Sequence, residues 1–127
     1  MPEATSMPLV QVDLPRPLFT ERGPQISAEI HQAFIDALEI PADDKFQVFR
    51  PREDGELIFD PGYGGVDRQS LVLIQVLMVH MYTVEAKRQL YRAIVTRLGS
   101  LGIRPEDIQI AVTENHFEDW YAGRLPG

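Results

Sequence analysis

The chain has 127 residues, 44% of them hydrophobic and 24% charged, which fits one globular domain with its own core. Its net charge is −7 and its Lys and Arg residues are scattered, which argues against a nucleic acid or an anionic membrane as partner. It contains no cysteine, so disulfides, thiolate catalysis and cysteine-based zinc sites are excluded. Residues 1–6 are unpatterned and predict a flexible extension, followed by a single domain at 7–127 in a cytoplasmic protein.

The first half of the chain predicts a strand, a helix and one or two further strands. Residues 7–14 form a short apolar run whose last positions alternate between polar and apolar residues, which is typical of a strand. The prolines between residues 15 and 24 indicate a connecting loop. Apolar residues then recur every three or four positions and predict a helix at 24–40. Residues 46–50 alternate as a short strand, and 57–59 predict a second one.

The second half repeats this order. After a glycine-rich loop at 60–65, which lacks the residues of a phosphate-binding loop, 71–79 is apolar on both faces and predicts a strand buried inside a sheet. Thr83 is placed to cap a helix at 84–98. Residues 108–114 then alternate as the last long strand.

Two β-α-β units in tandem predict an α/β (α+β) fold, with a four-stranded sheet and both helices on one of its faces. Each crossover helix makes the two strands of its unit parallel. The other face of the sheet has no helix to cover it. Because 71–79 is apolar on both sides, we expect that face to be buried against other subunits.

Pro8 has two interpretations. A proline is tolerated at the first position of a strand, since it has no N–H to give to the sheet. Alternatively, if translation starts at Met7 and that residue is removed, Pro8 carries a free amine. An α-amino group has an ordinary pKa of about 7.7 to 8.0 and can act as a base, an acid or a nucleophile. With Met7 still attached, the Pro8 nitrogen is an amide without a basic lone pair, and removal of Met1 alone exposes Pro2 instead.

Three segments resemble the tautomerase superfamily. They are Met7-Pro8-Leu9-Val10 at the start of a strand, the stretch 40–48 after the first helix, and Thr113-Glu114-Asn115 followed by Asp119-Trp120. Their order and spacing, over 7–123, are most similar to the branch that includes malonate semialdehyde decarboxylase. The resemblance implies a tautomerase-like domain at 7–127, a homotrimer, no cofactor, and proton transfer on a small oxo acid or enol by an N-terminal proline. It also implies weak decarboxylase or hydratase activity.

The same resemblance assigns candidate site residues. Pro8 and Asp44 are the expected catalytic residues; Asp44 would orient a water or favour the protonated amine through its charge, or is a solvated turn residue. His80 and Tyr82 fall where this branch has arginines that bind the substrate carboxylate. They can donate hydrogen bonds but lack the guanidinium fork. Trp120 is expected to wall the pocket or to pack at a subunit boundary.

The missing arginines leave several functions open. Arg50, Arg52 and Arg68 lie in or near predicted loops and either replace the lost pair or are solvated. The three histidines are too widely spaced to predict a metal site. The alternatives are an enzyme acting on an oxo acid such as phenylpyruvate, a non-catalytic trimer whose N-terminal extension blocks Pro8, and a ferredoxin-like module that binds a small ligand.

Overall fold

The structure is a computed structural model that describes residues 8–124. The predicted extension at 1–6 and the proposed start at Met7 lie outside this range. The helices and strands are β1 (Leu9–Pro15), α1 (Arg16–Leu38), β2 (Gln47–Arg52), β3 (Val72–Val79), α2 (Val84–Gly99) and β4 (Ile108–Asn115). Short 3₁₀ turns lie at Tyr63–Gly65, Pro105–Asp107 and Phe117–Asp119.

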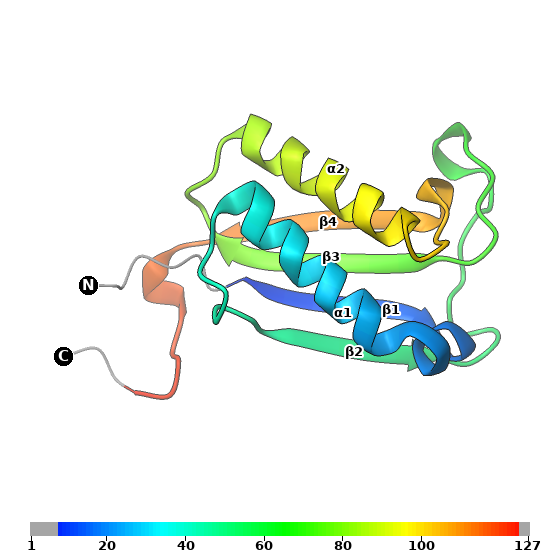
Figure 1. The fold of residues 1–127 in the computed structure, drawn as a ribbon, viewed down its shortest axis with the longest axis horizontal. Coiled ribbons are helices and arrows are strands. Elements are labelled where there is room, and N and C mark those ends of the chain that lie inside the picture. Colours follow the sequence, from blue (N-terminus) through cyan, green and yellow to red (C-terminus); the bar gives the residue numbers. More distant parts are fainter. Residues whose placement is uncertain (1–7, 125–127) are drawn as a thin grey trace.

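The strands form one mixed sheet in the order β2-β1-β3-β4. β1 and β2 are parallel, β3 and β4 are parallel, and β1 and β3 meet antiparallel at the centre. Both helices pack on the same face of the sheet (Figure 1). The predicted fold class, two β-α-β units with a four-stranded sheet and two helices on one face, is confirmed.

The core lies between the helices and the sheet. Alternate residues of β1 and β3 point into it, and α1 and α2 contribute residues three or four positions apart, as the periodicity predicts. Its fully buried members include Val12, Leu14, Ile26, Ile30, Phe34, Val72, Ile74, Met78, Leu90, Ile94 and Leu98.

The prediction that α1 begins at Pro24 is wrong: the helix begins at Arg16 and continues through Pro24. Pro15 ends β1 in an extended conformation and is the residue before the helix. Pro17 lies in the first turn, where a missing N–H leaves no hydrogen bond unmade. Prolines that were interpreted as a loop are thus accommodated at a strand end, in a first helical turn and inside the helix.

The predicted strand at 57–59 does not form; the segment belongs to a loop. A turn closed by the Glu56 N–H donating to the Glu53 carbonyl over 3.1 Å ends the extended chain after β2, and residues 57–59 pair with none of the four strands. The predicted cap of α2 is confirmed, because the Thr83 side chain accepts a hydrogen bond from the Ala86 N–H over 3.0 Å.

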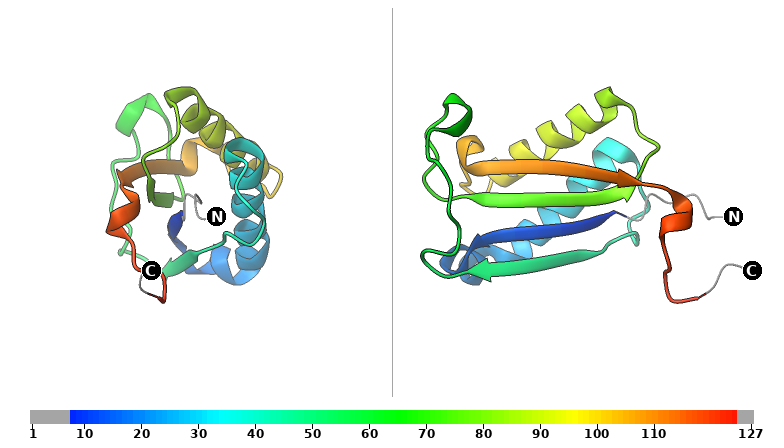
Figure 2. Two further views of the ribbon diagram at one scale, coloured as in Figure 1. Left: turned by 90° about the vertical axis from the view of Figure 1, so that its left-hand side faces the viewer. Right: turned by 180° about the vertical axis from the view of Figure 1, so that it is seen from behind.

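The sheet face opposite the helices is uncovered in the single chain, and the strands lie in front of both helices when the molecule is seen from behind (Figure 2). Leu9, Leu73 and Leu77 are only partly buried on this face. Asp13 is 5% exposed and forms an ion pair of 2.8 Å with Arg52. That subunits cover this face stays a prediction. Within residues 8–124, neither helix is long and apolar enough to cross a bilayer.

Candidate active site

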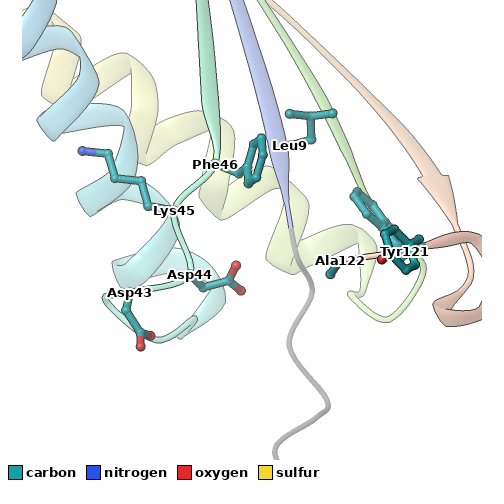
Figure 3. A pocket seen from close by; sticks show the side chains of 8 residues that line it. Leu9, Asp43, Asp44, Lys45, Phe46, Tyr121 and Ala122 are labelled. Atoms are coloured by element: carbon teal, nitrogen blue, oxygen red, sulfur yellow. The ribbon is translucent and has the colours of Figure 1, made fainter. Parts of the chain in front are cut away.

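A pocket of about 310 Å³ lies at one edge of the sheet. The amino ends of β1 and β2 and the carboxyl ends of β3 and β4 meet at this edge, beside the turn after α1 and the segment after β4 (Figure 1). The pocket is lined by Leu9, Asp43, Asp44, Lys45, Phe46, Trp120, Tyr121 and Ala122 (Figure 3).

Pro8 is buried and directly precedes Leu9 in the pocket wall. The Val10 N–H donates to the Phe46 carbonyl over 3.0 Å, which joins the start of β1 to the segment that leads into β2. β1 pairs with β3 as far as Leu9 opposite Leu77, so continuing the register by one residue sets Pro8 opposite Met78. Pro8 is therefore next to the pocket along the chain, but it is not one of the lining residues.

Asp44 follows the end of α1 in a turn closed by its own N–H, which donates to the Pro41 carbonyl over 3.0 Å. Its carboxylate is directed toward the space beneath Phe46 and Leu9, whereas the Asp43 carboxylate is directed away (Figure 3). The Lys45 ammonium is also directed away from this space (Figure 3). Since most of the wall is apolar, the Asp44 charge acts there with less solvent screening than at an open surface.

Trp120 is fixed by Asn115, the last residue of β4. The Trp120 Nε1–H donates to Asn115 Oδ1 over 2.8 Å, and the Asn115 carbonyl accepts the His80 N–H over 2.7 Å. Between Asn115 and Trp120 the chain forms a short turn, in which the Asp119 carboxylate accepts the His116 N–H over 2.9 Å. This geometry gives the Asn115 and Asp119-Trp120 parts of the sequence pattern a physical role: they hold an indole ring in the pocket wall.

His80 and Tyr82 are not among the lining residues. Tyr82 packs partly buried against the core. The His80 side chain is 64% exposed, with Nδ1 at 3.2 Å from Glu114 Oε1. The pocket thus brings together Asp44, Trp120 and the neighbour of Pro8, and it leaves His80 and Tyr82 outside.

Among residues 8–124, no arginine lines this pocket. Arg52 pairs with Asp13, and Arg50 donates to Gln11, both on the uncovered face of the sheet. Arg68 donates to the Tyr63 carbonyl and, over 3.1 Å, to Gln109 Oε1 at the other edge of the sheet. The three arginines considered as substitutes for the missing pair are therefore engaged elsewhere.

Glu114 carries a cluster that was not predicted. Its Oε1 atom lies 3.3 Å from the Lys87 ammonium, as well as 3.2 Å from His80 Nδ1. Desolvation raises the pKa of the Glu114 carboxyl, but hydrogen bonds from His80 and Lys87 outweigh it, so the pKa lies below its ordinary value. Glu114 therefore stays an anion at neutral pH. Among residues 8–124, no three metal-ligating side chains are grouped to hold a metal ion.

A family model described as a tautomerase enzyme matches residues 44–123. The chain belongs to the tautomerase family. It is 39% identical over 119 residues to "Probable tautomerase YusQ" of Bacillus subtilis, a match covering 92% of this chain and 94% of that protein. The predicted resemblance to the tautomerase superfamily is thereby confirmed.

Among solved structures, this tautomerase-family chain is similar to malonate semialdehyde decarboxylases. It superposes on a malonate semialdehyde decarboxylase inhibited by 3-bromopropiolate with a TM-score of 0.85 and 32% identity, covering 91% and 89% of the two chains. A second malonate semialdehyde decarboxylase, an enzyme with decarboxylase and hydratase activities, gives 0.84 and 28%, with 91% of each chain covered. A fused 4-OT asymmetric trimer gives 0.76 at 18% identity, covering 91% and 92%, and shares the fold.

Proposed function

We propose that this chain is a cofactor-independent tautomerase that moves a proton on a small oxo acid or its enol, with the free amine of Pro8 as the proton acceptor. The observation that carries the proposal is the pocket at the start of β1, with largely apolar walls, the Asp44 carboxylate directed into it and Trp120 among its lining residues. Membership of the tautomerase family supports the same reaction class.

In this mechanism the neutral Pro8 amine accepts the proton from the carbon next to the substrate carbonyl. The electrons of that C–H bond form the C=C bond, and the carbonyl oxygen gains the negative charge and then a proton from water. The reverse sequence returns the ketone. Asp44 tunes the amine through its charge or orients the water, and Trp120 packs against the apolar part of the substrate.

We also propose that the working form is a homotrimer with its pockets near the subunit boundaries. The uncovered sheet face and the exposed aromatic rings of Phe46 (68%) and Tyr121 (66%) at the pocket support this assembly. Sedimentation equilibrium at several concentrations is expected to give three times the mass of one chain. A monomer at all concentrations would contradict it.

The test of the mechanism compares two forms of the protein that differ in their first residue. A chain begun at Met7, in which removal of the methionine frees Pro8, is compared with the chain that keeps residues 1–7. Ketonisation of phenylpyruvate enol, followed by ultraviolet absorbance, is expected only in the chain with a free Pro8, and intact mass confirms each start. Pro8→Ala in the shorter chain is expected to lower kcat/KM by about 10²-fold or more.

Pro105→Ala is the matched control, because Pro105 is exposed in the turn before β4 at the opposite edge of the sheet. Equal turnover by the long chain with residues 1–7 attached would rule out Pro8 as the base. Absence of turnover in both chains, with the long form found in the native host, would favour the non-catalytic trimer.

A second candidate activity is decarboxylation of malonate semialdehyde, favoured by the similarity to two decarboxylases of known structure. The absence of an arginine from the pocket lining argues for a different acid. Release of CO₂ from malonate semialdehyde, measured beside phenylpyruvate ketonisation, separates the two: the larger kcat/KM identifies the better substrate class.

A further inference from the structure

We propose that Lys87 and His80 bind the carboxylate of the substrate and that Glu114 positions them. In this chain the cluster of these three residues would take the role that a pair of arginines has in the resembling branch. The inference rests on the proposed function in one respect, namely that the ligand is a small oxo acid. Lys87 had no role in the sequence-based prediction.

Glu114, at the centre of the cluster, lies in line with Pro8 across the sheet, with one residue of β3 between them. Met78 pairs with Glu114 in the parallel ladder, and the continued β1–β3 register sets Pro8 opposite Met78 from the other side. Paired residues point to the same face of a sheet, and the buried Met78 marks this face as the one covered by the helices. Two strand spacings amount to about 10 Å between the backbones of Pro8 and Glu114, and the cluster lies outside the residues that line the pocket.

The chemistry of the cluster suits an incoming anion. Glu114 Oε1 engages both His80 Nδ1 and the Lys87 ammonium, so one carboxylate charge faces one permanent cation and one ionisable ring. Lys87 has three N–H donors and gives one of them to Glu114. A substrate carboxylate would accept from a second proton of Lys87, and from His80 Nε2 only when both ring nitrogens carry protons, since Nδ1 faces Glu114.

Burial and exposure fit this role. The Lys87 and Glu114 side chains are each 21% exposed, which holds the ammonium in place, while the 64% exposed His80 ring opens the cluster toward solvent. Glu114 Oε2 is buried without a hydrogen-bond partner among residues 8–124. That oxygen is a hydrogen-bond acceptor and does not bind the substrate carboxylate. The exposed ring of His80 is the part of the cluster that is open to a ligand.

The first experiment separates binding from catalysis in the chain begun at Met7. Lys87→Met is expected to raise KM for phenylpyruvate about 10-fold or more, with a smaller change in kcat. Lys87→Arg keeps the positive charge and is expected to have a KM close to that of the unsubstituted chain. For the neutral methyl ester of phenylpyruvate, Lys87→Met is expected to change KM little. Arg92→Met is the matched control, since Arg92 lies on α2, pairs with Glu85 and faces solvent.

A second experiment needs no turnover. Phenylpyruvate is titrated into the chain carrying Pro8→Ala, and the imidazole resonances of His80 are followed by ¹⁵N NMR. The shifts are expected to saturate, with an affinity that drops about 10-fold in Lys87→Met and in Glu114→Gln but not in Arg92→Met.

The outcomes distinguish the two proposals. Binding that depends on Lys87 without turnover supports this inference and contradicts the proposed function. Turnover with an unchanged KM in Lys87→Met, an equal KM effect on acid and ester, or no phenylpyruvate binding to the Pro8→Ala chain would overturn this inference.

Discussion

Replacement of Pro24 by alanine is expected to stabilise the fold. Pro24 is exposed inside α1, where it has no N–H to donate to the Thr20 carbonyl one turn earlier. A proline inside a helix is less favourable than alanine by about 3 kcal/mol. The loss of proline's restriction on the unfolded chain returns about 1 kcal/mol of this. The net gain is therefore about 2 kcal/mol, or roughly 6 °C in Tm for a domain of this size.

The assay is urea unfolding of both chains at one protein concentration, because assembly makes apparent stability depend on concentration. Pro41→Ala is the matched control: Pro41 is exposed in the turn after α1, outside the helix, so alanine there is expected to lower stability by about 1 kcal/mol or less. If Pro24→Ala leaves the midpoint unchanged or lowers it at an unchanged slope, the continuous path of α1 through Pro24 is refuted.

Three other substitutions probe the fold and the pocket. Gly23→Ala is expected to destabilise by about 1 to 2 kcal/mol in urea unfolding, because its Cβ would lie 2.9 Å from ring atoms of Phe19. Asn115→Ala is expected to free the indole of Trp120, the sole tryptophan, with a red-shifted emission and a raised KM for phenylpyruvate; unchanged emission would contradict the anchoring. The lowered pKa of Glu114 contributes stability that is present above its unfolded value of 4.5 and lost as pH falls through the folded value. The stability difference between wild type and Glu114→Gln should therefore shrink between pH 6 and pH 3.5, and a constant difference would oppose this linkage.

The elements predicted well were those with one strong periodicity and clear end signals. β3 and α2 are examples: an uninterrupted apolar run defines the first, and Thr83 with apolar residues at helical spacing defines the second. The start of α1 was missed because prolines are common both in loops and in first helical turns, and local sequence does not separate the two. The segment 57–59 has a suitable pattern, but it follows the turn at Glu53–Glu56 and pairs with none of the four strands.

The site divides in the same way. Asp44 and Trp120 were expected from a sequence pattern, and the structure explains their proximity through the parallel pairing of β1 with β2 and the turn that follows Asn115. Lys87 was missed because its contact with Glu114 depends on the register between β3 and β4 and on how α2 packs above them. Such long-range geometry has no signature within a window of neighbouring residues.

In the proposed mechanism, the balance of charge at the pocket decides whether the free amine of Pro8 acts as a base or as an acid. The Asp44 carboxylate favours the protonated amine, whereas the apolar wall favours the neutral one. Asp44→Asn removes the first influence, so the pKa of the amine is expected to fall. In the pH profile of kcat/KM, the limb that reports the amine should move to lower pH. A base then gains activity near pH 6, and an acid loses activity near pH 8.

Asp43→Asn removes an equal charge whose carboxylate is directed away from the pocket, and it should move this limb of the pH profile less. Equal displacement in both variants would mean that net charge alone sets the limb. A loss of kcat without displacement would assign Asp44 to orienting water instead of tuning the amine.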